Sequence, residues 1–170
     1  MTEITRRHTI GLEERHHEHR ERVRAFVDEE IAPVVDDYEE RGEFPVDVIE
    51  KLGEAGFYGI TVPEEYGGAG LDHRSLVVTI EELARVWKIP AGVVSLSCGL
   101  IANTLESFAD DWQKEEWLAD VFTENQITAV SLTEPQAGSD ANNLETTAER
   151  DGDEYVDRKS TRLNSSHYRT

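Results

Sequence analysis

The chain has 170 residues, and 38% of them are hydrophobic, which is enough for a folded core and too many for a disordered protein. Its 17 basic and 36 acidic residues give a net charge of −19, which argues against a protein that follows nucleic-acid phosphates. No run approaches the roughly 18 apolar residues of a membrane span, and the N-terminus is polar, so we expect a cytoplasmic protein with neither a membrane span nor a nucleic-acid partner.

Arginine far outnumbers lysine, and the acids are spread along the chain rather than massed in one tail. A dispersed acidic surface keeps a protein soluble in strong salt, where self-repulsion is screened. A salt-loving source with an acidic proteome and an ordinary acidic bacterial protein are both compatible with this composition. The single Cys98 excludes an internal disulfide, and its apolar surroundings predict a buried structural thiol.

Helical spacing of apolar residues predicts the first two helices. From Gly11 to Gly42 apolar positions recur every three or four residues, and Pro33 should bend or split that helix. A second helix is expected to begin at Pro45, because proline suits a first helical turn, and to end at Gly56.

A glycine-rich loop, VPEEYGGAGLD at 62–72, comes next. Its proline and glycines favour turn geometry, and they do not follow a strand, so they are not a dinucleotide-binding fingerprint. Asp72 or Ser75 should cap a third helix, which Pro90 is expected to end. The nearly uncharged stretch 91–108 predicts a central helix.

Several aromatic and histidine side chains lie at helical spacing. A short amphipathic helix should carry Trp112 and Trp117, and we interpret these two residues and Trp87 as core anchors rather than a cofactor-binding box. His16 and His19 are three residues apart, which is compatible with a metal site. We favour an exposed, charged helix face instead, and we predict no metal ligand.

Strand patterns begin only near residue 127. The segment ITAVSLTEP, which starts at Ile127, is typical of a buried strand that enters a loop. Residues 148–156 predict two short strands about an Asp151-Gly152 turn, a strong hairpin signal. The chain therefore places several helices first and strands last.

The last residues, 158–170, differ abruptly in composition. They hold four basic residues and no acid, and without them the chain would carry 13 basic and 36 acidic residues, a net charge of −23. They show no strand alternation or helical periodicity, and they resemble a translated sequencing-adapter remnant. A natural basic tail is the alternative. We expect a non-native tail without stable structure.

The segment LTEPQAGSD, Leu132–Asp140, holds the candidate functional residues. Pro135 forces a turn, and Gly138 allows close approach of a ligand to the backbone. Thr133 and Ser139 supply hydroxyls, and successive backbone N–H groups can face an anion or the edge of a heteroaromatic ring. These features suit a flavin, although on its own the segment also fits an ordinary polar loop.

LTEPQAGSD and VPEEYGGAG resemble two signatures of the acyl-CoA dehydrogenase family, and they occur in the family's order. The segment DWQKEEWL at 111–118 and its neighbours also match the family's layout just ahead of its β region. The likeness covers about Ile10 to Asp157. It implies a mainly α fold, with an N-terminal helical bundle domain at 1–125, the first strands of a β-barrel-like middle domain at 126–157, and the foreign tail at 158–170.

The resemblance also implies a chemistry. Family members bind FAD and oxidise the α,β carbon–carbon bond of an acyl-CoA thioester to the trans-2-enoyl form. A carboxylate removes the α-proton while the β-hydrogen passes as hydride to the flavin. Electrons go to an electron-transfer flavoprotein, and the subunits assemble as a homotetramer or homodimer. The glycine-rich loop would lie near the acyl pocket.

Positions that match the motif take over its implied roles. The flavin-contacting residues would be Val130, Ser131, Leu132, Thr133, Gly138 and Ser139. Leu132 and Thr133 would contact the flavin pyrimidine, and Gly138 and Ser139 would lie beside the pyrophosphate. Ser139 would also lie near the substrate.

The sequence departs from the family at its end. The family continues with a strand bearing a Trp-Ile-(Thr/Ser) signature, where this chain has residues 158–170. The family's catalytic base belongs to a C-terminal helical bundle that this chain lacks, so no catalytic residue is assigned. Glu134 lies in the motif, but the family does not use it as the base. We expect the chain by itself to be inactive.

Two other interpretations stay open at this point. The parent protein could be another member of the superfamily, such as an acyl-CoA oxidase or a flavin-dependent monooxygenase. Alternatively, the chain could be a free-standing helical interaction module without a cofactor, in which case it would not turn yellow with flavin.

Overall fold

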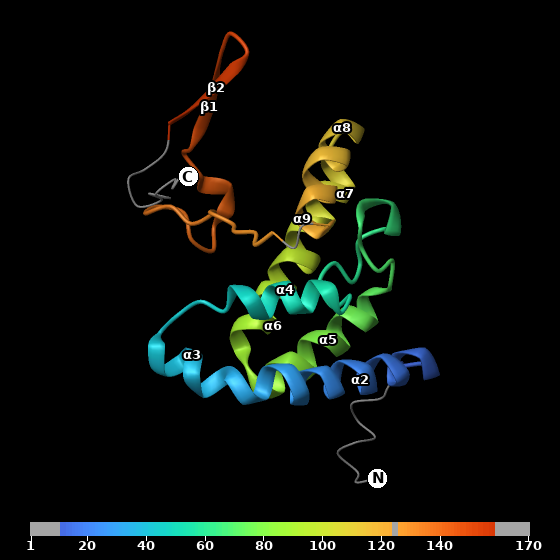
Figure 1. The fold of residues 1–170 in the computed structure, drawn as a ribbon. Helices are drawn as coiled ribbons and strands as arrows, with labels where there is room; N and C mark the ends of the chain where they lie inside the picture. The colour runs from blue at the N-terminus through green and yellow to red at the C-terminus, as the bar shows by residue number, and fades with distance from the viewer. Residues whose placement is uncertain (1–10, 124–125, 159–170) are drawn as a thin grey trace. The chain divides into compact units, whose positions relative to one another are not determined.

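A computed structural model describes residues 11–123 and 126–158. The chain divides into two compact units, with the boundary after Ala129; the first is helical and the second carries a β-hairpin (Figure 1). The helices are α2 (Glu14–Phe26), α3 (Val35–Arg41), α4 (Val46–Glu54), α5 (His73–Val86), α6 (Lys88–Val94), α7 (Asn103–Phe108), α8 (Asp111–Gln113) and α9 (Ala119–Thr123), and the strands are β1 (Thr147–Asp151) and β2 (Glu154–Arg158). A mainly α fold followed by the first strands of a β region is therefore confirmed.

The first predicted helix is split, as expected, around Pro33. A π-helical turn at Val27–Ile31 and a 3-10 turn at Ala32–Val34 separate α2 from α3. Because proline has no N–H to donate within a helix, the wider π-helical turn and the tighter 3-10 turn accommodate it. Gly42 then ends α3 in the left-handed conformation, with a φ of 63°.

The predicted cap of α5 is correct, but its predicted end is not. Asp72 accepts a hydrogen bond from the backbone N–H of Ser75 at 3.0 Å. The helix stops at Trp87, whose extended backbone (φ −147°, ψ 121°) separates α5 from α6. Pro90 instead lies in the first turn of α6. Backbone N–H groups there have no partner within the helix, so the N–H that proline lacks costs no hydrogen bond.

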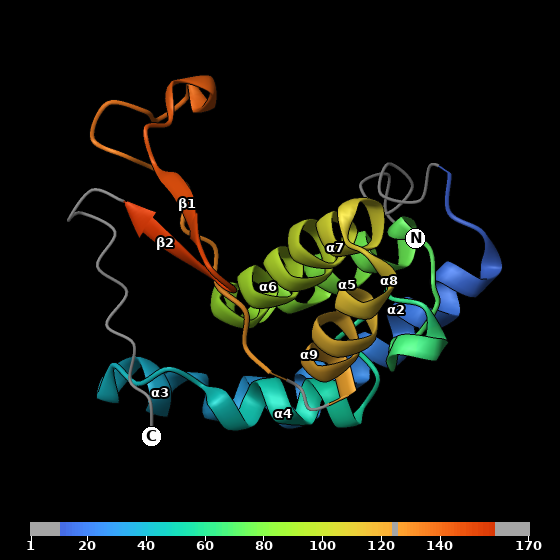
Figure 2. The same cartoon turned by 90° about the horizontal axis from the view of Figure 1, so that it is seen from above.

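The helical unit has one apolar core, to which α2, α4, α5 and α6 contribute (Figure 2). Cys98 is fully buried within it, as predicted, and its Sγ accepts the backbone N–H of Gly59 at 3.2 Å. The largest fully buried apolar side chains are Ile31, Ile49, Leu52, Ile60, Leu83 and Leu118. The helical stretch Lys88–Phe108 is long and apolar enough to cross a membrane, a test that core helices also pass, and its Cys98 lies in the core.

The three tryptophans differ in environment. Trp87 is buried in the core, as predicted. Trp112 and Trp117 are 54% and 45% exposed, so their assignment as core anchors is wrong. Their rings pack edge-to-face on each other at 5.4 Å instead, while Leu118 is the buried residue of the turn Lys114–Leu118.

The glycine-rich loop folds back on itself, as its sequence predicted. Ala69 donates to the Gly59 carbonyl at 3.0 Å, and Gly70 donates to the Val62 carbonyl at 2.8 Å. A Cβ atom on Gly68 would stand 2.1 Å from the Val62 oxygen, so no other residue fits there. Gly67 has a positive φ of 80° that favours glycine. Whether the loop borders an acyl pocket stays a prediction.

A chain of hydroxyl groups holds the segment that leads out of the helical unit. Tyr58 donates to the Gln126 carbonyl at 2.8 Å, so its oxygen accepts from Ser97, also at 2.8 Å. Ser97 in turn lies 2.7 Å from the Thr128 hydroxyl. Because each hydroxyl has one proton to give, donation runs from Thr128 through Ser97 and Tyr58 to Gln126.

The β-hairpin is present where it was expected. β1 and β2 pair antiparallel, with Asp151 opposite Glu154 and Gly152 in the two-residue loop at a φ of 66°. The buried strand predicted from Ile127 is absent. Residues 127–133 have no regular secondary structure and pair with no strand among the described residues, and Leu132 is 53% exposed. Of the tail predicted at 158–170, Arg158 is the last residue of β2 and lies opposite Thr147, so the expectation of no stable structure is wrong for this residue. Residues 159–170 lie outside the described residues.

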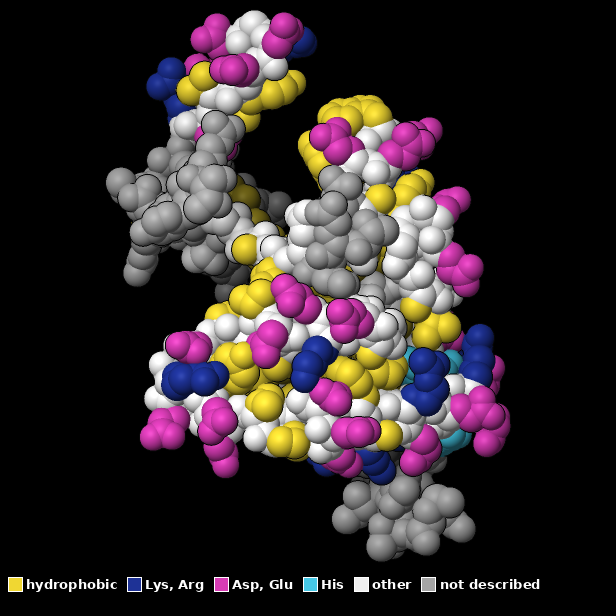
Figure 3. Space-filling view, viewed as in Figure 1, with side chains coloured by type: hydrophobic (Ala, Val, Ile, Leu, Met, Phe, Trp, Pro, Cys, Tyr) yellow, Lys and Arg dark blue, Asp and Glu magenta, His cyan; other side chains and the backbone are white. Residues whose placement is uncertain are grey.

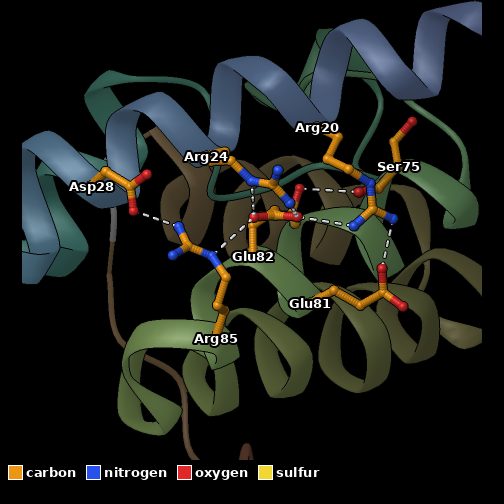
Figure 4. A network of polar contacts seen from close by, with 8 residues as sticks. Arg20, Arg24, Asp28, Ser75, Glu81, Glu82 and Arg85 are labelled. Atoms are coloured by element: carbon orange, nitrogen blue, oxygen red, sulfur yellow. Dashed lines mark hydrogen bonds and ion pairs between the residues drawn. The ribbon is translucent and has the colours of Figure 1, made fainter. Parts of the chain in front are cut away.

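A network of charged side chains joins α2 to α5 (Figure 4). Glu82 is 2% exposed, and its carboxylate accepts from Arg20 at 2.9 Å and from Arg24 at 2.8 and 2.9 Å. Arg85 approaches it at 3.3 Å from the same helix and also binds Asp28 at 2.5 Å. A single buried carboxylate is therefore surrounded by three guanidinium groups.

His16 and His19 of α2 are buried in this interface, so their interpretation as part of an exposed helix face is wrong, whereas His17 is partly exposed. His16 contacts the Asp72 carboxylate at 3.0 Å, and its Nδ1 accepts the Glu13 backbone N–H at 2.8 Å. The Thr79 hydroxyl donates to the Ser75 carbonyl, so it accepts from Nε2 of His19 at 2.8 Å. Among residues 11–123 and 126–158, no group of three or more metal-binding side chains is assembled.

On the face shown in Figure 3, acidic side chains are spread over the helical unit, with basic side chains between them. Many of the few basic side chains are engaged in ion pairs. They pair in the Glu82 cluster, between Lys51 and Glu30, and between Arg41 and Glu43. A dispersed acidic surface is thus visible in three dimensions.

Replacing Glu82 tests the central charge cluster. Glu82→Gln should lower the free energy of unfolding by about 2–3 kcal/mol, less than the roughly 3–5 kcal/mol of a fully buried pair, because Arg24 and Arg85 reach solvent. Urea unfolding at neutral pH measures the change. Glu81→Gln is the matched control, since Glu81 forms one exposed pair with Arg20 and should cost less than about 1 kcal/mol. Equal losses for the two variants would contradict the role of Glu82.

The interface also makes stability depend on pH. Burial, with a smaller effect of Arg22, lowers the pKa of His19 below its ordinary 6.5. Burial opposes ionisation of Glu82 and Asp72, but hydrogen bonds from Arg24 and from His16 outweigh it and lower both pKa values. In every case the unfolded chain binds protons that the folded chain does not, so stability falls as pH falls.

We therefore predict two losses of stability on acidification. The free energy of unfolding should decline first as pH drops below 6.5, because His19 becomes protonated there in the unfolded chain but not in the folded chain. It should decline again below 4.5, where the carboxylates become protonated in the unfolded chain. Urea unfolding between pH 8 and pH 3.5 measures both. His19→Gln should abolish the first decline only, whereas the control His17→Gln should leave it unchanged. A wild-type stability that is flat from pH 8 to pH 5 would refute the assignment to His19.

Candidate functional site in the Leu132–Asp140 loop

The motif closes into a turn at Pro135. The backbone N–H of Glu134 donates to the Ala137 carbonyl at 3.0 Å, and the N–H of Ala137 donates to the Glu134 carbonyl at 3.1 Å. Ala137 is buried beneath this turn. Thr133 therefore lies directly before one closed turn and Gly138 directly after it, and the turn itself was predicted from Pro135.

Glu134 ties the turn to the chain that follows it. Its side chain is 4% exposed and accepts the backbone N–H groups of Glu145 at 2.8 Å and of Thr146 at 2.9 Å. The Thr146 hydroxyl and the Gln136 amide also donate to it. The carboxylate thus holds one loop from residue 134 to residue 146.

These contacts explain why Glu134 is unsuited to proton abstraction. The hydrogen bond from the Thr146 hydroxyl, followed by the one from the Glu145 backbone, lowers the pKa of Glu134 below its ordinary 4.5. Both carboxylate oxygens are already engaged by donors. Its structural role was missed by sequence reasoning, because the partners lie eleven and twelve residues away with no pattern that links them.

The residues nominated for cofactor binding are all exposed. They are Val130, Ser131, Leu132, Thr133, Gly138 and Ser139. Leu132 and Thr133 precede the turn, and Gly138 and Ser139 follow it. The structure therefore brings the two halves of the nominated set to one turn and leaves their hydroxyls free to meet a ligand.

Gly138 supports a ligand at this loop. A Cβ atom there would meet nothing within 4 Å, and its φ is not positive, so the fold itself does not require glycine at this position. A bare backbone beside the Ser139 and Thr133 hydroxyls fits the edge and phosphate groups of a flavin nucleotide, which need close approach and hydrogen-bond donors. The residues present thus fit FAD.

Comparison with protein families identifies the helical unit. Residues 13–125 match the family model described as "Acyl-CoA dehydrogenase, N-terminal domain". The match ends just before the segment that leads into the motif, so the family assignment and the loop rest on separate parts of the chain.

Curated proteins resemble the chain over a longer stretch. The 3-(aryl)acrylate reductase of Clostridium sporogenes is 37% identical over 84% of this chain and 38% of its own length. The caffeyl-CoA reductase-Etf complex subunit CarC of Acetobacterium woodii is 38% identical over 81% of this chain and 36% of its own length. The chain therefore spans little more than a third of the relatives that it matches.

Solved structures share the fold. The acyl-CoA dehydrogenase of Geobacillus kaustophilus superposes with a TM-score of 0.80 at 38% identity, covering 88% of this chain and 39% of that protein. A Bacillus anthracis acyl-CoA dehydrogenase in complex with FAD superposes with a TM-score of 0.78 at 31% identity, covering 86% of this chain and 25% of that protein. The chain belongs to the acyl-CoA dehydrogenase family, and residues 13–125 are its N-terminal domain.

Proposed function

We propose that the full-length protein is an FAD-dependent acyl-CoA dehydrogenase that converts acyl-CoA thioesters to trans-2-enoyl-CoA. The observation that carries this proposal is the exposed loop that Glu134 closes, which presents Thr133, Gly138 and Ser139 together on a family-matching chain. Bound FAD would supply the acceptor for the β-hydrogen. The chain described here contributes cofactor contacts and no catalytic base.

Each residue of the loop has a role in this proposal. Leu132 and Thr133 contact the flavin pyrimidine, with the Thr133 hydroxyl as a hydrogen-bond partner. Gly138 admits the pyrophosphate close to the backbone, and Ser139 donates to it beside the substrate. The Glu134 turn keeps the two pairs in register, because residues 133 and 138 flank the same two backbone hydrogen bonds.

The electron partner and assembly are part of the same proposal. We propose that an electron-transfer flavoprotein accepts the electrons, which the resemblance to a subunit of a caffeyl-CoA reductase-Etf complex supports. We also propose a homotetramer or homodimer. An acidic, salt-adapted surface is supported by the net charge of −19.

The reverse reaction is a second candidate, because one relative is named a 3-(aryl)acrylate reductase and another a subunit of a caffeyl-CoA reductase-Etf complex. An anaerobic experiment on the full-length protein separates the two. Saturated acyl-CoA should bleach the absorbance of oxidised flavin if the protein is a dehydrogenase. Failure of butyryl-CoA and octanoyl-CoA to bleach it, together with reoxidation of reduced flavin by an arylacrylyl thioester, would favour the reductase.

Thr133 and Gly138 can be tested in the full-length protein. Thr133→Val keeps the side-chain shape but removes the hydroxyl, so FAD affinity should fall by about 1–3 kcal/mol, roughly 5- to 150-fold. Gly138→Ala should also weaken FAD binding without changing stability, because its Cβ atom meets only open space in the chain. Thr147→Val, on exposed β1, is the control. Fluorescence titration with FAD measures affinity, and unchanged binding in both test variants would remove these residues from the site.

Glu134 should act on the same site through the loop. Glu134→Gln replaces one acceptor oxygen by a donor that faces other donors, so the loop should open while the helical unit stays intact. Amide hydrogen exchange should become faster at Glu145 and Thr146 and stay unchanged in α5. Glu145→Gln, at an exposed position, is the control. Undiminished protection at both amides in Glu134→Gln would show that the carboxylate does not hold the loop.

A further inference from the structure

A cavity of about 250 Å³ lies in the helical unit, away from the Leu132–Asp140 loop in sequence. It lies at the end of α3, beside the turn that follows it and the break between α5 and α6. Its lining consists of Tyr38, Glu39, Gly42, Glu43, Phe44, Trp87 and Ile89. Three aromatic rings and two carboxylates thus meet in one small space.

The aromatic side chains are held in place by the fold. The rings of Tyr38 and Trp87 contact each other with centroids 5.6 Å apart and planes tilted by 35°. The Trp87 indole N–H donates to Glu39 at 2.6 Å, and the Tyr38 hydroxyl donates to Asp47. Phe44 is 48% exposed, so part of its ring can be reached by a ligand. The rings form a preformed pocket with one open side.

The charge of the cavity favours a cation. Glu39 accepts the Trp87 N–H, and no ion pair within the described residues neutralises it. Glu43 pairs with Arg41 at 3.0 Å, and the Arg41 guanidinium also lies 4.8 Å from the centre of the Tyr38 ring. Arg41 does not line the cavity, but its guanidinium already covers one face of the Tyr38 ring, so the Glu39 charge and the Phe44 and Trp87 rings are the groups left for an occupant.

We propose that this cavity binds a small quaternary ammonium cation of the choline type. The volume of about 250 Å³ is below the range of drug-sized sites, roughly 300–1,000 Å³, so the occupant must be small. Methyl groups on a cation suit the aromatic rings and Ile89, and they need no hydrogen bonds, whereas a primary ammonium would lose its water without replacement. A zwitterion with its own carboxylate would be repelled by Glu39, whose charge no ion pair among the described residues neutralises.

Fluorescence of Trp87 can report binding directly. The chain has three tryptophans, so the exposed Trp112→Phe and Trp117→Phe changes together leave Trp87 as the sole emitter. Titration of this 170-residue variant with choline chloride, against sodium chloride of equal ionic strength, should change its emission with saturation. The neutral isostere 3,3-dimethyl-1-butanol should bind about tenfold more weakly, because it has the shape of choline without its charge. Glycine betaine should also bind more weakly than choline.

Variants of the lining separate a built site from general ionic effects. Glu39→Gln keeps an oxygen for the Trp87 indole but removes the charge, and Phe44→Leu removes one ring at a half-exposed position. Each should weaken choline binding by roughly threefold or more. Phe108→Leu, which changes an 85% exposed ring outside the cavity, should have no effect. Equal affinity for choline and its neutral isostere, or unchanged choline affinity in both lining variants, would overturn the proposal.

Discussion

The helical unit depends on one buried carboxylate. Glu82 lies where α5 faces α2, and a charge at 2% exposure is unfavourable unless it is fully paired. Arg20 and Arg24 approach it from α2, and Arg85 approaches it from one turn further along α5. Because each arginine must reach the same two oxygens, the cluster fixes both the spacing and the register of the two helices.

A second set of polar contacts continues the same interface towards the start of α2. Asp72 caps α5 through Ser75 and at the same time accepts from His16. His19 binds Thr79 one turn further along. The interface is therefore specified by polar partners along its length, while apolar packing against α4 and α6 supplies the bulk of the burial. Polar partners of this kind specify register more sharply than apolar contacts do, because each donor needs its own acceptor.

The loop at 132–146 uses a carboxylate in a comparable way on a smaller scale. Glu134 gathers backbone and side-chain donors from residues that have no regular secondary structure of their own. A loop without a sheet or helix must satisfy its backbone N–H groups somehow, and a buried carboxylate accepts several of them at once. The exposed hydroxyls and the bare Gly138 backbone are consequently held in place and stay available for binding a ligand.

Local patterns in the sequence determined much of this protein. The helical spacing, the break around Pro33, the Asp72 cap, the folded glycine loop and the hairpin all follow from short-range rules about φ angles, missing N–H groups and side-chain periodicity. The binding role expected of Leu132–Asp140 came instead from the resemblance of its motif to a family signature. Only the tertiary structure decided that His16 and His19 are buried, that Trp112 and Trp117 are exposed, that the chain breaks at Trp87 rather than Pro90, and that residues 127–133 form no strand. The reason is physical. Burial, strand pairing and hydrogen bonds between distant segments depend on partners far away in sequence, and between α2 and α5 these partners are about 60 residues apart. No local pattern in the sequence shows which residues these partners are.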